Sequence, residues 1–229
     1  MERKPLDHIT SRVHETVAVV LQVRGSTLQV LLWRRARPPA KGRWALPGGR
    51  LDAGETLERS IRRHLAAKVD VRELSHLEQL ETHSDPTDGR VTTAYLGLIR
   101  SGIDPVVPAD TRWHPVANLP ATAFDHGAIA RAGRERLRAK LSYTNVGFAL
   151  APETFTISEL RDLYAAALGH EVSATNLQRV LLRRGVLVTT GELRTPGRAG
   201  GRPAAVYRFG SDRLEITDQF AALRPPETA

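Results

Sequence analysis

The sequence predicts an α/β protein of two domains, one over residues 1–150 and a smaller one over residues 151–229. Three observations support this prediction. The chain has 229 residues, which is enough for two modest hydrophobic cores. Strand-like and helix-like segments alternate through the first part. In the second part, two amphipathic helices come first, and a β-hairpin with a glycine-rich tip follows them.

The first domain opens with two apolar segments, VAVVLQV at 17–23 and LQVLLWRR at 28–35, on either side of the polar turn RGST. These segments are expected to pair as a β-hairpin. Two further strands are expected at 77–83 and 91–99, because they flank the turn-rich sequence SDPTDGR. A helix that ends near Leu141 is expected to close the domain.

Between the two strand pairs, a helix is expected from Thr56 to Lys68, because apolar side chains recur with helical spacing at Leu57, Ile61 and Leu65. The surrounding segment, GRLDAGETLERSIRRHLAAKVDV, resembles the Nudix box, whose pattern is G-x5-E-x7-R-E-U-x-E-E-x-G-U with U a bulky aliphatic residue. The residues that match this pattern are Gly49, Glu55, Arg63, Leu65 and Val71. The three carboxylate positions hold His64, Ala67 and Lys68, and the late glycine position holds Asp70.

The replaced positions determine the chemistry expected of this helix. Side chains at i, i+3 and i+4 share one helix face, so carboxylates there would converge on Mg²⁺, which neutralises diphosphate charge and activates water. This chain offers an imidazole, a methyl group and an ammonium instead. We therefore expect no metal site, no catalytic residue and no efficient hydrolysis. Glu55 and Arg63 are expected to form a structural ion pair between loop and helix.

The Nudix resemblance implies an α/β/α sandwich with a pocket shaped for a nucleoside diphosphate. Arginines suit diphosphate oxygens, tryptophan can stack on adenine, and consecutive glycine amides can face an anion. The ligand-binding candidates are Arg34, Arg35, Arg43, Trp44, Gly48 and Gly49. Two alternatives stay open, which are core packing for Trp44 and a plain surface position for Arg34. His64 and Lys68 are further candidates to supply positive charge in place of a metal.

The second domain begins with a helix marked by a capping box of Thr156 and Glu159 and ended by Gly169. Ser173 is expected to cap a second helix that runs to Gly185. Two helices separated by so short a turn indicate a helix-turn-helix. The polar residues on the outer face of the second helix, and so the candidates for DNA contact, are Asn176, Arg179 and Arg183.

Two strands, at 186–193 and 204–209, are expected to pair across the loop RTPGRAGGRP. This pattern is typical of the wing of a winged helix, because glycines allow close backbone approach and arginines neutralise phosphates or enter a minor groove. The DNA-binding candidates of the wing are Arg198 and Arg202, and Arg194 lies at the start of the same loop. For Arg184, DNA contact and capping of its helix stay open. The basic run from Arg131 to Lys140 fits phosphate contacts or a solvated helix.

In this order, a Nudix-like domain without its acids and a winged helix with the sequence GRPAAVYRF resemble the Nudix-related transcriptional regulators of NAD metabolism. The resemblance implies a dimeric repressor of NAD biosynthesis or salvage genes that binds a double-stranded, palindromic DNA operator. It also implies that the Nudix-like domain senses ADP-ribose or a related nucleotide as its effector, with no cofactor required. If operator and effector favour different domain arrangements, each weakens binding of the other.

Composition agrees with a polyanionic partner, because the formal net charge is +8 and the isoelectric point is about 10.5. The chain has no cysteine and no apolar segment of membrane-spanning length, so we expect a cytoplasmic protein without a membrane contact. Three other functions stay open. They are an active Nudix hydrolase of ADP-ribose-like nucleoside diphosphates with an accessory DNA-binding domain, a regulator with another ligand, and a nonspecific nucleic-acid-binding protein.

Overall fold

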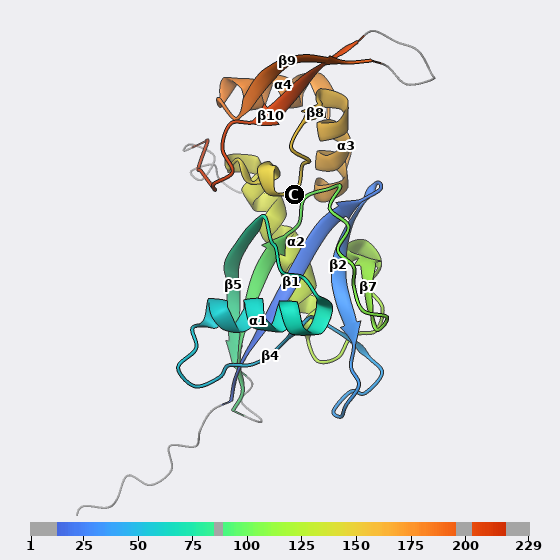
Figure 1. Ribbon diagram of the computed structural model, residues 1–229, viewed down its shortest axis with the longest axis vertical. Helices are drawn as coiled ribbons and strands as arrows, with labels where there is room; N and C mark the ends of the chain where they lie inside the picture. The colour runs from blue at the N-terminus through green and yellow to red at the C-terminus, as the bar shows by residue number, and fades with distance from the viewer. Residues whose placement is uncertain (1–12, 85–88, 196–202, 219–229) are drawn as a thin grey trace, which may run out of the picture.

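The computed structural model describes residues 13–84, 89–195 and 203–218. Within these ranges, a mixed sheet contains seven strands in the order β3-β2-β1-β6-β5, with β4 paired to β1 and β7 paired to β2 (Figure 1). Its strands are β1 (His14–Arg24), β2 (Thr27–Arg34), β3 (Trp44–Ala45), β4 (Gly48–Arg50), β5 (His76–Ser84), β6 (Val91–Leu98) and β7 (Thr111–Pro115). The β1 and β6 strands are parallel, and the other pairs in this sheet are antiparallel.

Helices cover both faces of this sheet, which confirms the α/β/α sandwich. On one face, α1 (Leu57–Val69) packs Ile61 and Leu65 against Ala18 and Val20 of β1. On the other face, the helices are α2 (His126–Tyr143) and the short η1 (Val116–Asn118) and η2 (Val146–Ala149). The approach of α2 is close, because a Cβ at Gly133 would lie 2.7 Å from Cγ1 of Val19.

The ends of α1 follow from local chemistry. The side chain of Thr56 accepts a hydrogen bond from the backbone of Arg59 at 3.2 Å, and so it caps the first turn. The helix stops at Asp70, which adopts a left-handed conformation with φ of +51°. This is the position where the Nudix pattern has glycine, and aspartate is among the few other residues that tolerate such a backbone.

The second domain has the elements of a winged helix, as predicted. They are β8 (Phe155–Thr156), α3 (Ile157–Leu168), α4 (Ala174–Arg183), β9 (Leu187–Arg194) and β10 (Ala204–Phe209). Thr156 and Glu159 form the expected capping box, Gly169 ends α3 with φ of +74°, and Ser173 caps α4. The three strands pair in the order β8-β10-β9. The hairpin of β9 and β10 lies with α4 at the end of the molecule away from β4 (Figure 1).

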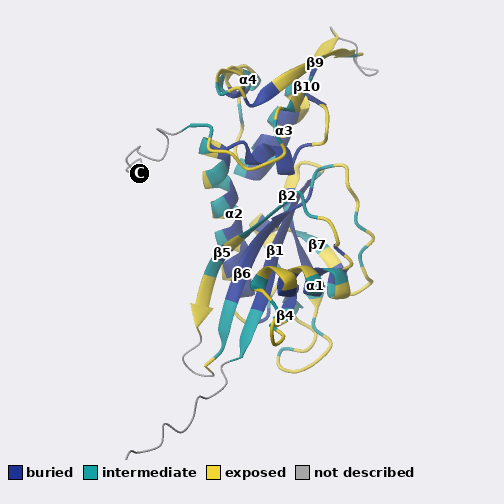
Figure 2. Ribbon diagram, turned by 60° about the vertical axis from the view of Figure 1, so that its left-hand side comes forward, coloured by how far each residue is buried: buried dark blue, intermediate teal, exposed yellow. Residues whose placement is uncertain are grey.

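The two domains share one hydrophobic core. It runs from Val19 of β1 and Leu137 of α2, through Phe148 of η2, to Leu160 and Leu163 of α3. Figure 2 shows buried residues from the central strands to α3. The helix α3 therefore joins the winged-helix part to the sheet, and the division at residue 150 stays a prediction. No helix in the described ranges is both long enough and apolar enough to cross a bilayer.

Candidate functional site

The face of α1 that carries acids in the Nudix pattern is occupied by groups with other partners. His64 is buried, and its Nε2 donates a hydrogen bond to the carbonyl oxygen of Arg50 at 2.9 Å. Burial, and to a lesser extent the nearby charges of Arg63 and Lys68, lower the pKa of His64. The imidazole is therefore neutral at pH 7, and it packs so closely that a Cβ at Gly49 would lie 2.6 Å from its Cε1 atom.

Lys68 places a positive charge on the same helix face. Its Nζ donates a hydrogen bond to the carbonyl oxygen of Gly48 and lies 4.7 Å from the centroid of the Trp33 ring. Burial, followed by the charge of Arg35, lowers the pKa of Lys68, whereas the charge of Glu15 opposes this shift. The charges of Arg35 and Glu15 are thus close enough to shift the pKa of this ammonium.

These side chains do not fit a magnesium ion, which needs several oxygen ligands. In place of carboxylates, the helix face offers a half-buried ammonium, an imidazole committed to a carbonyl and the exposed methyl group of Ala67. Across the residues that the structure describes, no group of three or more His, Asp or Glu side chains is placed to hold a metal ion.

The two box residues with opposite charge form a clamp, as predicted. The Nε and Nη2 atoms of Arg63 donate to the two carboxylate oxygens of Glu55 at 2.9 and 2.7 Å. The hydrogen bond from Arg63 is the main cause that lowers the pKa of Glu55 to about 2. A second acid, Asp52, lies 3.0 Å from the same guanidinium. This clamp fixes the loop before α1 and does not contribute to a metal site.

A cavity of about 380 Å³ lies at the end of the sheet where α2 begins. Phe124, which precedes α2, is partly exposed and adopts a left-handed φ of +52°. Its ring contacts two cations, with Cζ of Arg35 4.9 Å and Cζ of Arg90 5.6 Å from the ring centroid. Arg90 also lies 3.5 Å from Glu15, which lines the same cavity. A planar group and a diphosphate would meet an aromatic ring and arginines here.

The wall of this cavity is fixed by His126, the first residue of α2. Its Nδ1 accepts a hydrogen bond from the backbone amide of Leu46 at 2.9 Å, which ties the segment before β4 to the start of α2. Burial lowers the pKa of His126 to about 4, so the ring is neutral at physiological pH. It therefore acts as a fixed acceptor and adds no charge to the cavity.

The predicted ligand residues are only partly brought together. Arg35 lies over the ring of Phe124, which lines the cavity, whereas Arg34 is exposed with its Cζ 5.5 Å from the centroid of the Trp44 ring. Trp44 packs against the core and meets His114 edge-on at 4.5 Å, which favours the packing alternative. Arg43 donates to the carbonyl oxygen of Thr122 at 3.5 Å.

Gly48 and Gly49 belong to β4, where the lack of a side chain is required by packing against β1 and α1. Their role in anion binding stays a prediction. Sequence patterns did not single out Glu15, Arg90, Phe124 or His126, which come from three distant segments. The available signal was an aromatic residue in the polar sequence FDHG immediately before a helix.

The predicted DNA-binding residues of α4 share an exposed face. Leu177 and Leu181 are buried, while Asn176, Arg179 and Arg183 are exposed. Nη2 of Arg179 donates to the side-chain oxygen of Asn176 at 2.7 Å, so the two side chains form one polar unit. Figure 2 shows the exposed side of α4 at the outer end of the molecule. This is the arrangement that a helix needs to enter a major groove.

Other arginines of the basic regions have internal partners. Arg184 lies 2.6 Å from the carboxylate of Asp218, and Arg194 lies 2.6 Å from that of Glu159. The α2 run is also partly paired, because Glu78 contacts Arg136 and Lys140, and Glu135 contacts Arg134 and Arg138. These ion pairs favour structural roles over DNA contact for Arg184, Arg194 and the paired arginines of α2. The wing candidates Arg198 and Arg202 lie outside the described residues.

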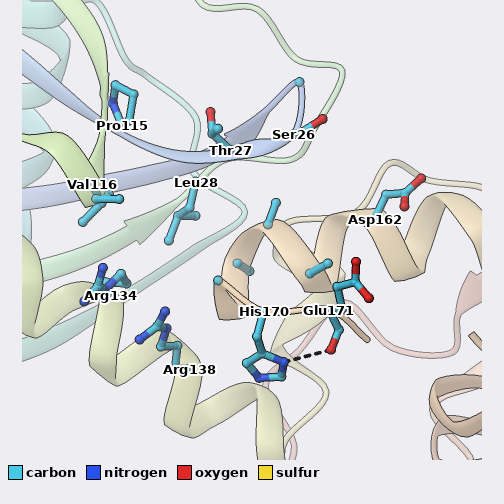
Figure 3. A pocket seen from close by; sticks show the side chains of 16 residues that line it. Ser26, Thr27, Leu28, Pro115, Val116, Arg134, Arg138, Asp162, His170 and Glu171 are labelled. Atoms are coloured by element: carbon cyan, nitrogen blue, oxygen red, sulfur yellow. Dashed lines mark hydrogen bonds between the residues drawn. The ribbon is translucent and has the colours of Figure 1, made fainter. Parts of the chain in front are cut away.

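A larger cavity of about 740 Å³ lies at the junction of the two domains. Figure 3 shows Arg134 and Arg138 of α2 with Leu28 of β2 and Val116 of η1 above them in the view, and His170 and Glu171, which follow α3, to their right. Arg138 contacts that end closely, because a Cβ at Gly169 would lie 2.4 Å from its Nη2. Arg138 and the end of α3 are therefore in close contact, and the cavity lies beside this contact.

Sequence profiles of two families match the chain. The profile of the NUDIX domain matches residues 13–132, and that of the NrtR DNA-binding winged helix domain matches residues 147–209. The chain is 30% identical over 201 residues to the ADPR responsive transcriptional repressor NtrR of Acinetobacter baylyi, and the match covers 83% of this chain and 79% of that protein.

Two solved structures are also similar. The crystal structure of Shewanella oneidensis NrtR complexed with a 27mer DNA has 32% identity and a TM-score of 0.70, over 85% of this chain and 92% of that chain. The NUDIX domain of the same Shewanella protein, complexed with ADP ribose, has 32% identity and a TM-score of 0.50, over 58% of this chain and 94% of that chain.

Proposed function

Because the chain belongs to the NrtR family of Nudix-related regulators, we propose that it is a DNA-binding transcriptional repressor whose Nudix domain binds ADP-ribose or a related metabolite. The observation that carries this proposal is the ammonium of Lys68 on the carbonyl oxygen of Gly48, at a carboxylate position of the Nudix box. The proposed genes are those of NAD biosynthesis or salvage, as the sequence resemblance implies.

The cavity beside Phe124 is the proposed effector site. Arg90 lines it together with the acids Glu15 and Asp125, and Arg35 lies over the same Phe124 ring. Guanidinium groups bind diphosphate oxygens through paired hydrogen bonds, and the exposed ring provides a stacking surface for adenine. The neutral His126 holds the cavity wall in place.

Binding without hydrolysis follows from the same helix face. Hydrolysis of a diphosphate in this domain needs a cation held by carboxylates and a water activated by it. Here the positive charge belongs to a side chain, which neutralises phosphate charge but cannot activate water as a metal does. We infer that the pocket keeps its effector intact, and that Lys68 replaces part of the electrostatic role of the metal.

Operator binding is proposed for α4 and the wing. Asparagine pairs with adenine and arginine with guanine in a major groove, so Asn176, Arg179 and Arg183 are proposed to contact bases or phosphates there. Arg198 and Arg202 are proposed for the wing. A palindromic operator requires two copies of this domain related by twofold symmetry, and we propose a homodimer for that reason.

The α2 helix is suited to couple the two sites. It begins at His126 in the effector cavity, and 18 residues give it a length of about 27 Å. Arg138, in its second half, contacts the end of α3, and α3 shares the core with β1. A small shift of the α2 start on effector binding would therefore move the packing of α3 and the helix-turn-helix that it belongs to.

An operator titration tests the proposal. Fluorescence anisotropy of a labelled promoter fragment is measured with the full-length protein, with and without ADP-ribose, and with AMP as a control that lacks the diphosphate. We expect ADP-ribose to weaken operator binding by roughly 5- to 150-fold, the usual range of allosteric coupling, and AMP to have little effect. Equal affinities in all three samples would remove ADP-ribose as the effector.

A further inference from the structure

The arginine at the base of the wing has a carboxylate partner in α3. Arg194 is the last residue of β9, and its Nη1 donates to Oε1 of Glu159 at 2.6 Å and also contacts Oε2. The carboxylate of Glu159 in turn accepts hydrogen bonds from the backbone and hydroxyl of Thr156, at 2.7 and 3.1 Å. One carboxylate therefore caps α3 and binds the wing.

We propose that the ion pair of Glu159 and Arg194 is a positioning device that sets the direction of the wing for operator binding, and that Arg194 does not contact DNA phosphate. This inference rests on the proposed function. It differs from the sequence pattern, in which Arg194 was one of several loop arginines available to DNA.

The strand geometry shows why the wing needs such an anchor. Among the described strands, β9 pairs only with β10 and lies at the edge of the small sheet. Most of its residues are exposed, so little buried surface holds it. Its register with β10 shifts between Ala205 and Tyr207, and Gly191 in β9 has φ of +82°. Beyond this irregularity, two residue pairs join the strands before the loop begins.

The ion pair links this weakly held end to the most firmly held helix of the domain. Leu160 and Leu163 of α3 are buried in the core shared with the first domain. One guanidinium nitrogen, Nη1 of Arg194, contacts both carboxylate oxygens of Glu159, and this charged contact ties the end of β9 to the first turn of α3. The orientation of the wing is thereby set relative to α3, and α4 follows α3 after a short turn.

A phosphate contact and a positioning role for Arg194 have opposite consequences for operator affinity when its acidic partner Glu159 is replaced. If Arg194 contacted phosphate, replacing its acidic partner would free the guanidinium and remove a negative charge near DNA, so the operator would bind more tightly. If Arg194 positions the wing, the same replacement releases the strand and weakens binding. The variant Glu159→Gln separates these cases, because glutamine still completes a capping box with Thr156 while the charge of the pair is lost.

The experiment measures operator affinity by anisotropy for the full-length protein and for Glu159→Gln. We expect binding about two- to five-fold weaker in the variant, the range given by an exposed ion pair. Glu192→Gln is the matched control, because Glu192 is an exposed acid of the same strand and makes the same change in charge. We expect its operator affinity to be unchanged or slightly higher.

Two further variants complete the test. Arg194→Gln and the double variant Glu159→Gln/Arg194→Gln are expected to bind operator as weakly as Glu159→Gln alone, since all three lack the same pair. Arg194→Lys keeps one charged contact and is expected to recover part of the affinity. Thermal unfolding of each variant is followed in parallel, and a midpoint within about 2 °C of the unaltered protein shows that the fold is retained.

Operator binding by Glu159→Gln that is as tight as, or tighter than, that of the unaltered protein would overturn the positioning role. A double variant much weaker than either single variant would overturn it as well, because the two residues would then act separately. Failure of the unaltered protein to bind any promoter fragment would instead remove the proposed function, and this inference with it.

Discussion

The ammonium of Lys68, in the last turn of α1, donates a hydrogen bond to the carbonyl oxygen of Gly48 in β4. This contact holds a fixed positive charge between the helix and the sheet, where the Nudix pattern calls for a carboxylate. The helix keeps its cap at Thr56 and its clamp of Glu55 and Arg63. The domain thus retains the framework of a nucleotide pocket with a different charge at its centre.

The first prediction concerns this charge. Lys68→Ala is expected to weaken ADP-ribose binding at least about tenfold, because a hydrogen bond to a charged group contributes about 1.5 to 3 kcal/mol. Isothermal titration calorimetry measures the affinity, with Mg²⁺ and then with a chelator. Arg62→Ala is the control, since Arg62 is exposed on the same helix and pairs with Glu58. Equal losses in both variants would contradict the special role of Lys68.

The second prediction concerns the strained aromatic residue. Phe124 has φ of +52°, a conformation that costs a non-glycine residue about 1 kcal/mol or more. Phe124→Gly is expected to leave thermal stability unchanged or raise it, while ADP-ribose affinity falls about fivefold or more because the stacking surface is lost. Thermal unfolding and calorimetry measure the two effects. Unchanged affinity would show that the ring is not part of the effector site.

The third prediction is a dependence of stability on pH. The pKa of His126 is about 4 in the folded protein, whereas that of an unperturbed histidine in the unfolded chain is about 6.5. Folding therefore favours the neutral imidazole. The stabilisation is complete above about pH 6.5 and is lost as the pH falls toward 4, by roughly 3 kcal/mol in all.

The variant His126→Asn isolates this effect, since an amide oxygen can accept the hydrogen bond of Leu46 without titrating. Denaturant unfolding between pH 7 and 4.5 measures both proteins. We expect the unaltered protein to lose more free energy of unfolding over this range than the variant does. Parallel losses would assign the pH dependence to other groups.

The fourth prediction compares two neighbouring arginines. Arg183 is exposed on α4, whereas Arg184 is paired with Asp218 at 2.6 Å. Arg183→Ala is expected to weaken operator binding and reduce the slope of log affinity against log salt by about 1, with little change in stability. Arg184→Ala is expected to lower the unfolding midpoint and leave that slope nearly unchanged. Reversed effects would exchange the two roles.

Local patterns predicted much of the fold. The helix caps at Thr156, Gly169 and Ser173 were evident because capping uses residues close together in the sequence. The ion pair of Glu55 and Arg63 followed from the spacing of the Nudix box. These features depend on contacts within one or two turns of a helix.

The effector site and the wing were less predictable, because their contacts join distant segments. Phe124 meets Arg35 and Arg90 only when the sheet brings three parts of the chain together. Likewise, the number of arginines in the wing could not distinguish a phosphate contact from the pairing of Arg194 with Glu159. Charge patterns indicate a polyanionic partner, but tertiary packing decides which cations remain available to it.

Phosphorus NMR of ADP-ribose in the presence of the protein and Mg²⁺ tests the central claim most directly. We predict that the diphosphate resonances shift on stoichiometric binding and persist through prolonged incubation, and that added operator DNA reverses the shift. Steady replacement of these resonances by those of phosphate monoesters would contradict the account, because the domain would then be a working hydrolase.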